Sequence, residues 1–135
     1  MPTMIFVNLP VKDLQRSTEF YTALGYGTNP QFSDENATNV VISDTIYLML
    51  LVEPYFKTFT DRQVIDATTS IQTILALSAE SRDEVDALVD RALAAGGTAP
   101  RGPQDEGFMY QRSFTDPDGH LFEILWMDPN AQPPT

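Results

Sequence analysis

An internal repeat constrains the fold of this chain more than any other feature of its sequence. A β-branched strand, a capping Asp or Ser, a helix that ends at glycine and three further strands occur in residues 4–52 and again in residues 73–127. One such unit cannot bury its sheet alone, so the two units should pack side by side. We predict an α+β fold in which two βαβββ repeats form curved mixed sheets around a central cleft, with a helix on the outer face of each.

Local signals place the elements of each repeat. Capping residues and stop glycines mark the helices: Asp13 with Gly25, and the capping box Ser81–Glu84 with Gly96. Hydrophobic periodicity then predicts the helices at residues 14–24 and 82–95, and strands at residues 4–11, 28–33, 39–43, 46–52, 73–79, 98–101, 108–115 and 120–127.

The last part of the chain combines a strong turn with a strand that carries one acid. Asp116-Pro117-Asp118-Gly119 favours a turn, because Pro presets φ and Gly accepts a positive φ. The apolar run that follows predicts a strand buried on both faces. Alternation turns one set of its side chains to the cleft and the other to the core, namely Leu121, Glu123 and Leu125 against Phe122, Ile124 and Trp126. A buried carboxylate is costly unless a cation or a hydrogen-bond donor compensates it, so the role of Glu123 is the central question.

Composition excludes several classes of function. The absence of cysteine excludes a disulfide scaffold, a thiolate metal site and a cysteine nucleophile. The net charge of −11 repels phosphate, and no basic stripe offsets it, so neither nucleic acid nor an anionic membrane is an expected partner. No apolar run approaches the roughly 20 residues of a membrane span and no signal peptide is visible, so a cytoplasmic protein is expected. The length suits one domain spanning residues 1–135, with a loose tail at residues 128–135.

The repeat and two motifs resemble the vicinal oxygen chelate superfamily, which includes glyoxalase I, bleomycin-resistance proteins and extradiol dioxygenases. The motifs are Val11-Lys12-Asp13-Leu14, which enters a helix ending Phe20-Tyr21-Thr22-Ala23-Leu24-Gly25, and the closing Phe114-Thr-Asp-Pro-Asp-Gly-His-Leu-Phe-Glu123. The resemblance covers nearly the whole chain. It implies the two-repeat fold, a homodimer and a cleft for a small organic molecule.

The resemblance also implies positions for a divalent metal, on the first and last strand of each repeat. Aligning the repeats matches Phe6 with Ile74 and Met49 with Glu123, and of these four positions only Glu123 offers a donor. The one imidazole, His120, lies three residues before Glu123 and so faces the other side of the strand. A catalytic divalent site needs about three protein ligands. We therefore predict no metal and no other cofactor.

Three roles for Glu123 stay open at the level of sequence. It is a structural residue paired with an Arg or bonded to Tyr or Gln, a ligand contact, or a catalytic general base. Hairpin register would place Gln111 or, one residue on, Arg112 opposite it, while the resemblance favours Gln111 and Ser113 on the cleft side. We expect a carboxylate without a cation, kept for a ligand or a proton. The predicted ligand-binding residues are Phe6, Asn8, Met49, Ile74, Gln111, Ser113 and Glu123, and Glu123 is also the candidate catalytic residue.

The resulting prediction is a metal-independent protein that binds a small organic molecule in an apolar cleft around Glu123, as antibiotic-sequestering relatives do. An alternative is a metal-dependent glyoxalase-like lyase, isomerase or dioxygenase that uses Glu123. Another is a dimeric interaction module with a filled cleft. Residues 54–69 lack periodicity but carry Tyr55, Phe56 and Phe59, which need cover and so favour a homodimer.

Overall fold

The computed structural model describes residues 2–131 and contains two four-stranded mixed sheets. In the first sheet β1 and β4 form a parallel pair, and the other pairs are antiparallel. The order of its strands is β1 (Ile5–Val11), β4 (Ile46–Val52), β3 (Ala37–Val41) and β2 (Gly27–Thr28). The last four residues of the predicted loose tail lie outside the described residues.

The second sheet repeats this arrangement, with β5 and β8 as its parallel pair. Its order is β5 (Ile74–Ser78), β8 (Leu121–Met127), β7 (Met109–Thr115) and β6 (Gln104–Asp105). Helix α1 (Leu14–Ala23) follows β1, and helix α3 (Arg82–Ala94) follows β5. The predicted α+β fold of two βαβββ modules is confirmed, with sheets that are curved but open.

The helix ends follow the predicted capping signals. Asp13 accepts a hydrogen bond from the Arg16 backbone N–H at 3.1 Å, and the Ser81 hydroxyl accepts one from the Glu84 N–H at 3.1 Å. Beyond α1, Gly25 has φ of 104°, a left-handed conformation that favours glycine. The entry and exit of each helix are therefore fixed by local chemistry.

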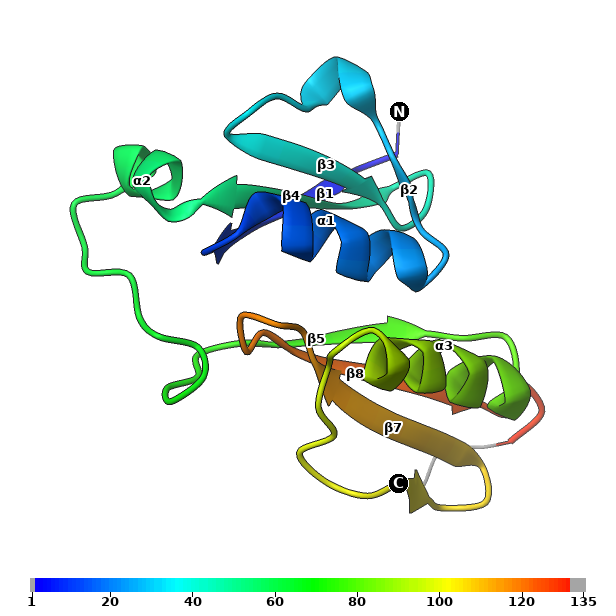
Figure 1. The fold of residues 1–135 in the computed structure, drawn as a ribbon. Coiled ribbons are helices and arrows are strands. Elements are labelled where there is room, and N and C mark those ends of the chain that lie inside the picture. Colours follow the sequence, from blue (N-terminus) through cyan, green and yellow to red (C-terminus); the bar gives the residue numbers. More distant parts are fainter. Residues whose placement is uncertain (1, 132–135) are drawn as a thin grey trace.

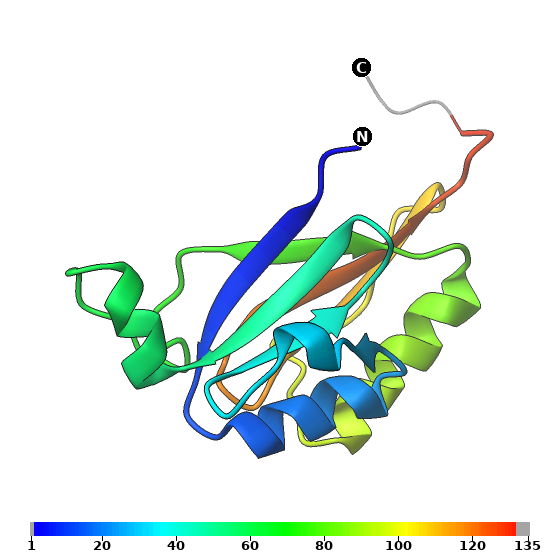
Figure 2. The same cartoon turned by 90° about the horizontal axis from the view of Figure 1, so that it is seen from above.

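Both helices lie on the same side of the sheets (Figures 1 and 2). Side chains of both helices belong to one hydrophobic core. Phe20 and Tyr21 of α1 meet the rings of Phe114 and Phe122 from the second sheet, and these last two stack at 5.1 Å. All four side chains are almost fully buried. The modules are thus joined through aromatic packing and not merely placed next to each other.

The sheet faces turned away from α1 and α3 form what we call the open face. On β8, Phe122 and Ile124 are buried on the helix side, whereas Leu121, Glu123 and Leu125 are only partly covered on the open face. The prediction of a strand buried on both faces is therefore wrong for one face. The alternation of its side chains is as expected.

Two predicted strands are shorter than expected because proline interrupts them. Residues 28–33 form the end of β2 and then the 3₁₀ helix η1 (Pro30–Phe32). Residues 98–101 form only a bridge between Thr98 and Thr115, since Pro100 lacks the N–H that a longer ladder requires. The linker between the modules contains α2 (Glu53–Phe56) and η2 (Lys57–Phe59) at one end of the sheets (Figures 1 and 2). Within residues 2–131, no helix has the length and apolar character to cross a membrane.

Candidate functional site

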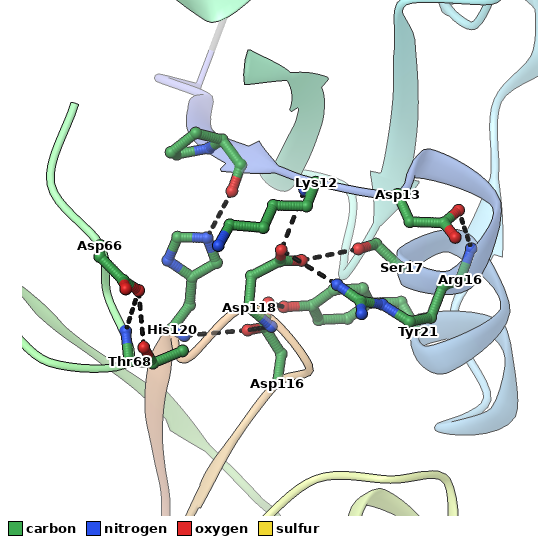
Figure 3. A network of polar contacts seen from close by, with 11 residues as sticks. Lys12, Asp13, Arg16, Ser17, Tyr21, Asp66, Thr68, Asp116, Asp118 and His120 are labelled. Carbon is green, nitrogen blue, oxygen red and sulfur yellow. Dashed lines mark hydrogen bonds and ion pairs between the residues drawn. The ribbon is translucent and has the colours of Figure 1, made fainter.

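The β7–β8 turn, which the sequence marks so strongly, reaches across to the start of α1 in the other module (Figure 3). The buried carboxylate of Asp118 accepts hydrogen bonds from the Lys12 backbone N–H at 3.0 Å, the Ser17 hydroxyl at 2.9 Å and the Arg16 guanidinium at 3.2 Å. Its negative charge also suits the N-terminal end of the helix. We call this contact the intermodule clasp.

Asp116 forms the second half of the clasp. It accepts hydrogen bonds from the Tyr21 hydroxyl at 2.6 Å and from the backbone N–H groups of Asp118 and His120. Burial raises the pKa of Asp116, and burial together with the nearby carboxylate raises the pKa of Tyr21 well above its ordinary value. The acids of this motif are therefore structural groups that form the turn and also join the two modules.

Glu123 lies on the open face of the central strand β8 and makes an ion pair. Its Oε2 lies 2.8 Å from the Arg101 guanidinium and 3.5 Å from the Gln111 amide nitrogen. The Glu123 side chain is 19% exposed and that of Arg101 is 50% exposed. The expectation of a carboxylate without a cation is wrong. Arg101 belongs to an irregular loop, so no sequence spacing connected it to Glu123.

The register around Glu123 also differs from both predicted alternatives. Ser113 lies directly opposite Glu123, while Gln111 pairs with Leu125 and Arg112 with Ile124. Gln111 still reaches the carboxylate diagonally, on the same face of the sheet. Arg112 points to the helix side and donates hydrogen bonds to two acids of α3, Asp86 and Asp90.

The equivalent position in the first module is Met49, which lies between Asn8 and Asn39. The Asn39 amide nitrogen lies 3.0 Å from the Met49 sulfur. Asn39 was absent from the predicted site. The repeat alignment could have identified Asn39. It matches Met49 with Glu123, and Ser113, the cross-strand partner of Glu123, was already a candidate.

Two polar atoms on this face are buried without a hydrogen-bond partner among the described residues, Asn39 Oδ1 and Ser113 Oγ. They occupy equivalent places, since Asn39 lies opposite Met49 and Ser113 opposite Glu123. Buried polar atoms nearly always have a partner in a native protein. Two unsatisfied atoms at matching positions therefore make this part of the open face a candidate binding surface.

The remaining predicted residues lie on the outer parts of the open face. Phe6 is 46% exposed and stacks on Tyr47, and Ile74 is 50% exposed. Around Glu123 the β5 partner Ala76 is apolar, whereas Arg101 and Gln111 bring polar groups to its carboxylate.

The residues do not fit the divalent metal that the superfamily fold implies. The four ligand positions supply one carboxylate, and that carboxylate is already bonded to a cation. Within residues 2–131, no three His, Cys, Asp or Glu side chains are grouped so that they could hold a metal ion.

The main pocket of the described chain lies away from Glu123. It has a volume of about 340 Å³ and is lined by β1, by linker residues 60–73 and by the start of β8. Among the predicted ligand-binding residues only Asn8 lines it. Leu121, which lies on the same face of β8 as Glu123, also lines this pocket.

Two βαβββ modules with one shared core, and a carboxylate on the last strand, define a vicinal oxygen chelate fold. The chain belongs to the Glyoxalase/Bleomycin resistance protein/Dioxygenase superfamily, whose family model matches residues 3–124. The comparison with curated proteins gave no match.

Solved structures share the fold over almost the whole chain. A hypothetical protein from S. aureus is 28% identical with a TM-score of 0.78, covering 93% of this chain and 94% of that one. A glyoxalase-related enzyme from Fulvimarina pelagi is 22% identical with a TM-score of 0.79, covering 93% and 88%. A bleomycin resistance determinant encoded on the transposon Tn5 is 18% identical with a TM-score of 0.63, covering 94% and 99%. The last two show the fold alone.

Proposed function

We propose that this chain binds a small organic molecule on the open face around Glu123, without a metal. The observation that carries the proposal is the buried Ser113 hydroxyl, which has no hydrogen-bond partner within residues 2–131 and lies directly opposite Glu123. A ligand with a hydroxyl or amide group would satisfy this atom. The Glu123–Arg101 pair beside it offers both a negative acceptor and a positive donor.

The ion pair also supports the metal-independent part of the proposal over the metal-dependent alternative. A metal would have to compete with Arg101 for its only carboxylate, and the other three family positions are Phe6, Met49 and Ile74. Metal analysis after purification without added ions should give well under one divalent ion per chain. A stoichiometric Ni, Zn, Fe or Mn content would contradict this part of the proposal.

The binding proposal is tested by a thermal-shift screen of small polar metabolites with three proteins: wild type, Ser113→Ala and a matched control, Ser43→Ala. Ser43 lies in the β3–β4 turn of the first module, whereas Glu123 lies in the sheet of the second module. Ser113→Ala removes an unsatisfied buried hydroxyl and should leave the melting temperature unchanged or raised. Ligands that stabilise the wild type and the control should stabilise Ser113→Ala less. A loss of stability of about 2 kcal/mol without any loss of binding would show a structural role instead.

We also propose that the protein acts as a homodimer that covers the apolar rim of the open face. Three large apolar side chains there are about half exposed: Phe6 at 46%, Ile74 at 50% and Met127 at 54%. An apolar surface of this kind marks an interface more often than a free surface. Sedimentation should show a dimer that Phe6→Glu dissociates, while Phe32→Glu, a matched change on η1, leaves it intact. A wild-type monomer at every concentration would exclude the dimer.

A further inference from the structure

We propose that the pocket between β1, the linker and His120 is a second ligand site, for a small apolar molecule that carries a hydroxyl group. The pocket is separate from the site proposed at Glu123, because neither Glu123 nor its partners Arg101, Gln111 and Ser113 line it. Its volume of about 340 Å³ is within the range of small-molecule sites. The two sites are therefore tested independently.

The walls of the pocket are held in place by close packing of the linker. Gly119 has φ of +94°, and a Cβ added there would lie 2.6 Å from the Ala67 carbonyl carbon. The linker backbone therefore rests directly on the β7–β8 turn, where only glycine fits. A pocket with a wall fixed in this way is formed before any ligand arrives, which lowers the entropic cost of binding.

Most of the lining is apolar, which suits the body of such a ligand. The linker contributes Val64, Ile65 and Ile71, and the two sheets contribute Leu75 and Leu121. Ile65 is 49% exposed and Ile71 is 60% exposed in the free chain. An apolar molecule bound here would cover side chains that otherwise face water, and this burial is favourable.

His120 supplies the polar recognition. Its Nε2 lies 2.8 Å from the Pro10 carbonyl oxygen, which can only accept, so Nε2 carries the hydrogen. In the neutral ring Nδ1 is then left as an acceptor, and it has no partner among the described residues. Figure 3 shows this second nitrogen turned away from Asp118, toward the linker segment of Asp66 and Thr68. His120 lines the pocket whereas Asp66 and Thr68 do not, so this acceptor lies at the rim of the pocket, where the hydroxyl of a ligand would donate to it.

The free edge of β1 adds backbone groups to the same wall. The Ile5 N–H bonds to the Thr45 carbonyl on the β4 side. Backbone groups of successive residues alternate between the two edges of a strand, so those of Asn8 and Pro10 point away from β4. The Pro10 carbonyl is taken by His120. Asn8, which lines the pocket, thus leaves a backbone donor and acceptor for the ligand.

The experiment is a titration of the full-length protein with 1-naphthol and with naphthalene, followed by amide chemical shifts in two-dimensional NMR. The wild type should bind 1-naphthol with shifts centred on Asn8, Val64 and Leu121. Naphthalene, which lacks the hydroxyl, should bind at least about fivefold more weakly. His120→Phe should reduce the affinity for 1-naphthol to that for naphthalene.

Two tryptophan variants of neighbouring exposed residues test the same site independently of His120→Phe, which is useful if that variant folds poorly. Ser70 lines the pocket and Thr69 does not. Ser70→Trp should weaken 1-naphthol binding about tenfold or more, and Thr69→Trp should leave it unchanged. Equal binding of naphthalene, unchanged binding by Ser70→Trp, or shifts centred on Gln111 and Glu123 would each overturn the proposal.

Discussion

The two modules agree on the helix side of their central strands and differ on the open face. Leu48 and Leu50 of β4 are buried, as are the equivalent Phe122 and Ile124 of β8. Between them stand Met49 in the first module and Glu123 in the second. The helix side is constrained by a core that both modules share, so only apolar residues are tolerated there. The open face carries no such constraint, and it is where the two modules differ.

The surroundings of Met49 and Glu123 have changed together with the residues themselves. Met49 lies beside an amide from β3, whereas Glu123 has a cation from the loop before β6. A residue that suits one module should therefore be tolerated poorly in the other. The following predictions test this comparison, beginning with the contact that joins the modules.

The largest effect is expected at the intermodule clasp. Asp118→Ala would leave the buried Ser17 hydroxyl and the Lys12 N–H without their acceptor, and should lower the free energy of unfolding by about 3 kcal/mol. Urea denaturation measures this. Asp13→Ala removes only the local cap of α1 and should cost about 1 kcal/mol. Equal losses in the two variants would mean that the clasp adds nothing beyond helix capping.

Exchanging the two open-face residues should have unequal effects. Met49→Glu places a carboxylate where no described cation makes an ion pair, and should cost about 2 kcal/mol. Glu123→Met frees an Arg101 side chain that is already half exposed, and should cost less than about 1 kcal/mol. The difference in unfolding free energy between the two variants is the quantity to compare. Similar costs would show that the two positions are interchangeable.

A smaller change removes only the negative charge of Glu123 on the open face of the second module. Glu123→Gln keeps the shape of the side chain and a weaker hydrogen bond to Arg101, so the loss of stability should stay below about 1 kcal/mol. Binding of ligands on the open face should fall more than stability does. A loss above about 3 kcal/mol would instead mark Glu123 as part of a structural network.

The smallest effect concerns the edge strands of the two sheets. An ion pair between Arg82 and Asp105 links α3 to β6, whereas β2 has no ion pair among the described residues. The Arg82 guanidinium lowers the pKa of Asp105 from 3.8 to about 2. Because the folded pKa is depressed, the contribution of Asp105 is present above the ordinary value and is lost as the pH falls through about 2. Asp105→Asn should flatten this acid limb of the stability curve. An unchanged pH profile would show that the pair contributes nothing measurable.

The clasp and the open face differ in how far the sequence could define them. The turn at Asp116–Gly119 was recognisable because its residues act on their own backbone. That its acids also reach Ser17 and Tyr21 was not recognisable, because those contacts join positions about a hundred residues apart. The ion pair of Glu123 with Arg101 was missed for a related reason. It depends on where an irregular loop lies, which no periodic pattern encodes.

The sequence by itself determined the repeat, the helix caps, the alternation of β8 and the membership of a superfamily fold. These features depend on residues close together in the chain, or on a pattern that occurs twice. Only the tertiary structure decided that Ser113 lies opposite Glu123, that Arg101 neutralises it, and that the main pocket is built by the linker against His120. Register, loop position and packing between the modules result from the balance of many weak contacts over the whole core, and no short stretch of sequence carries that balance.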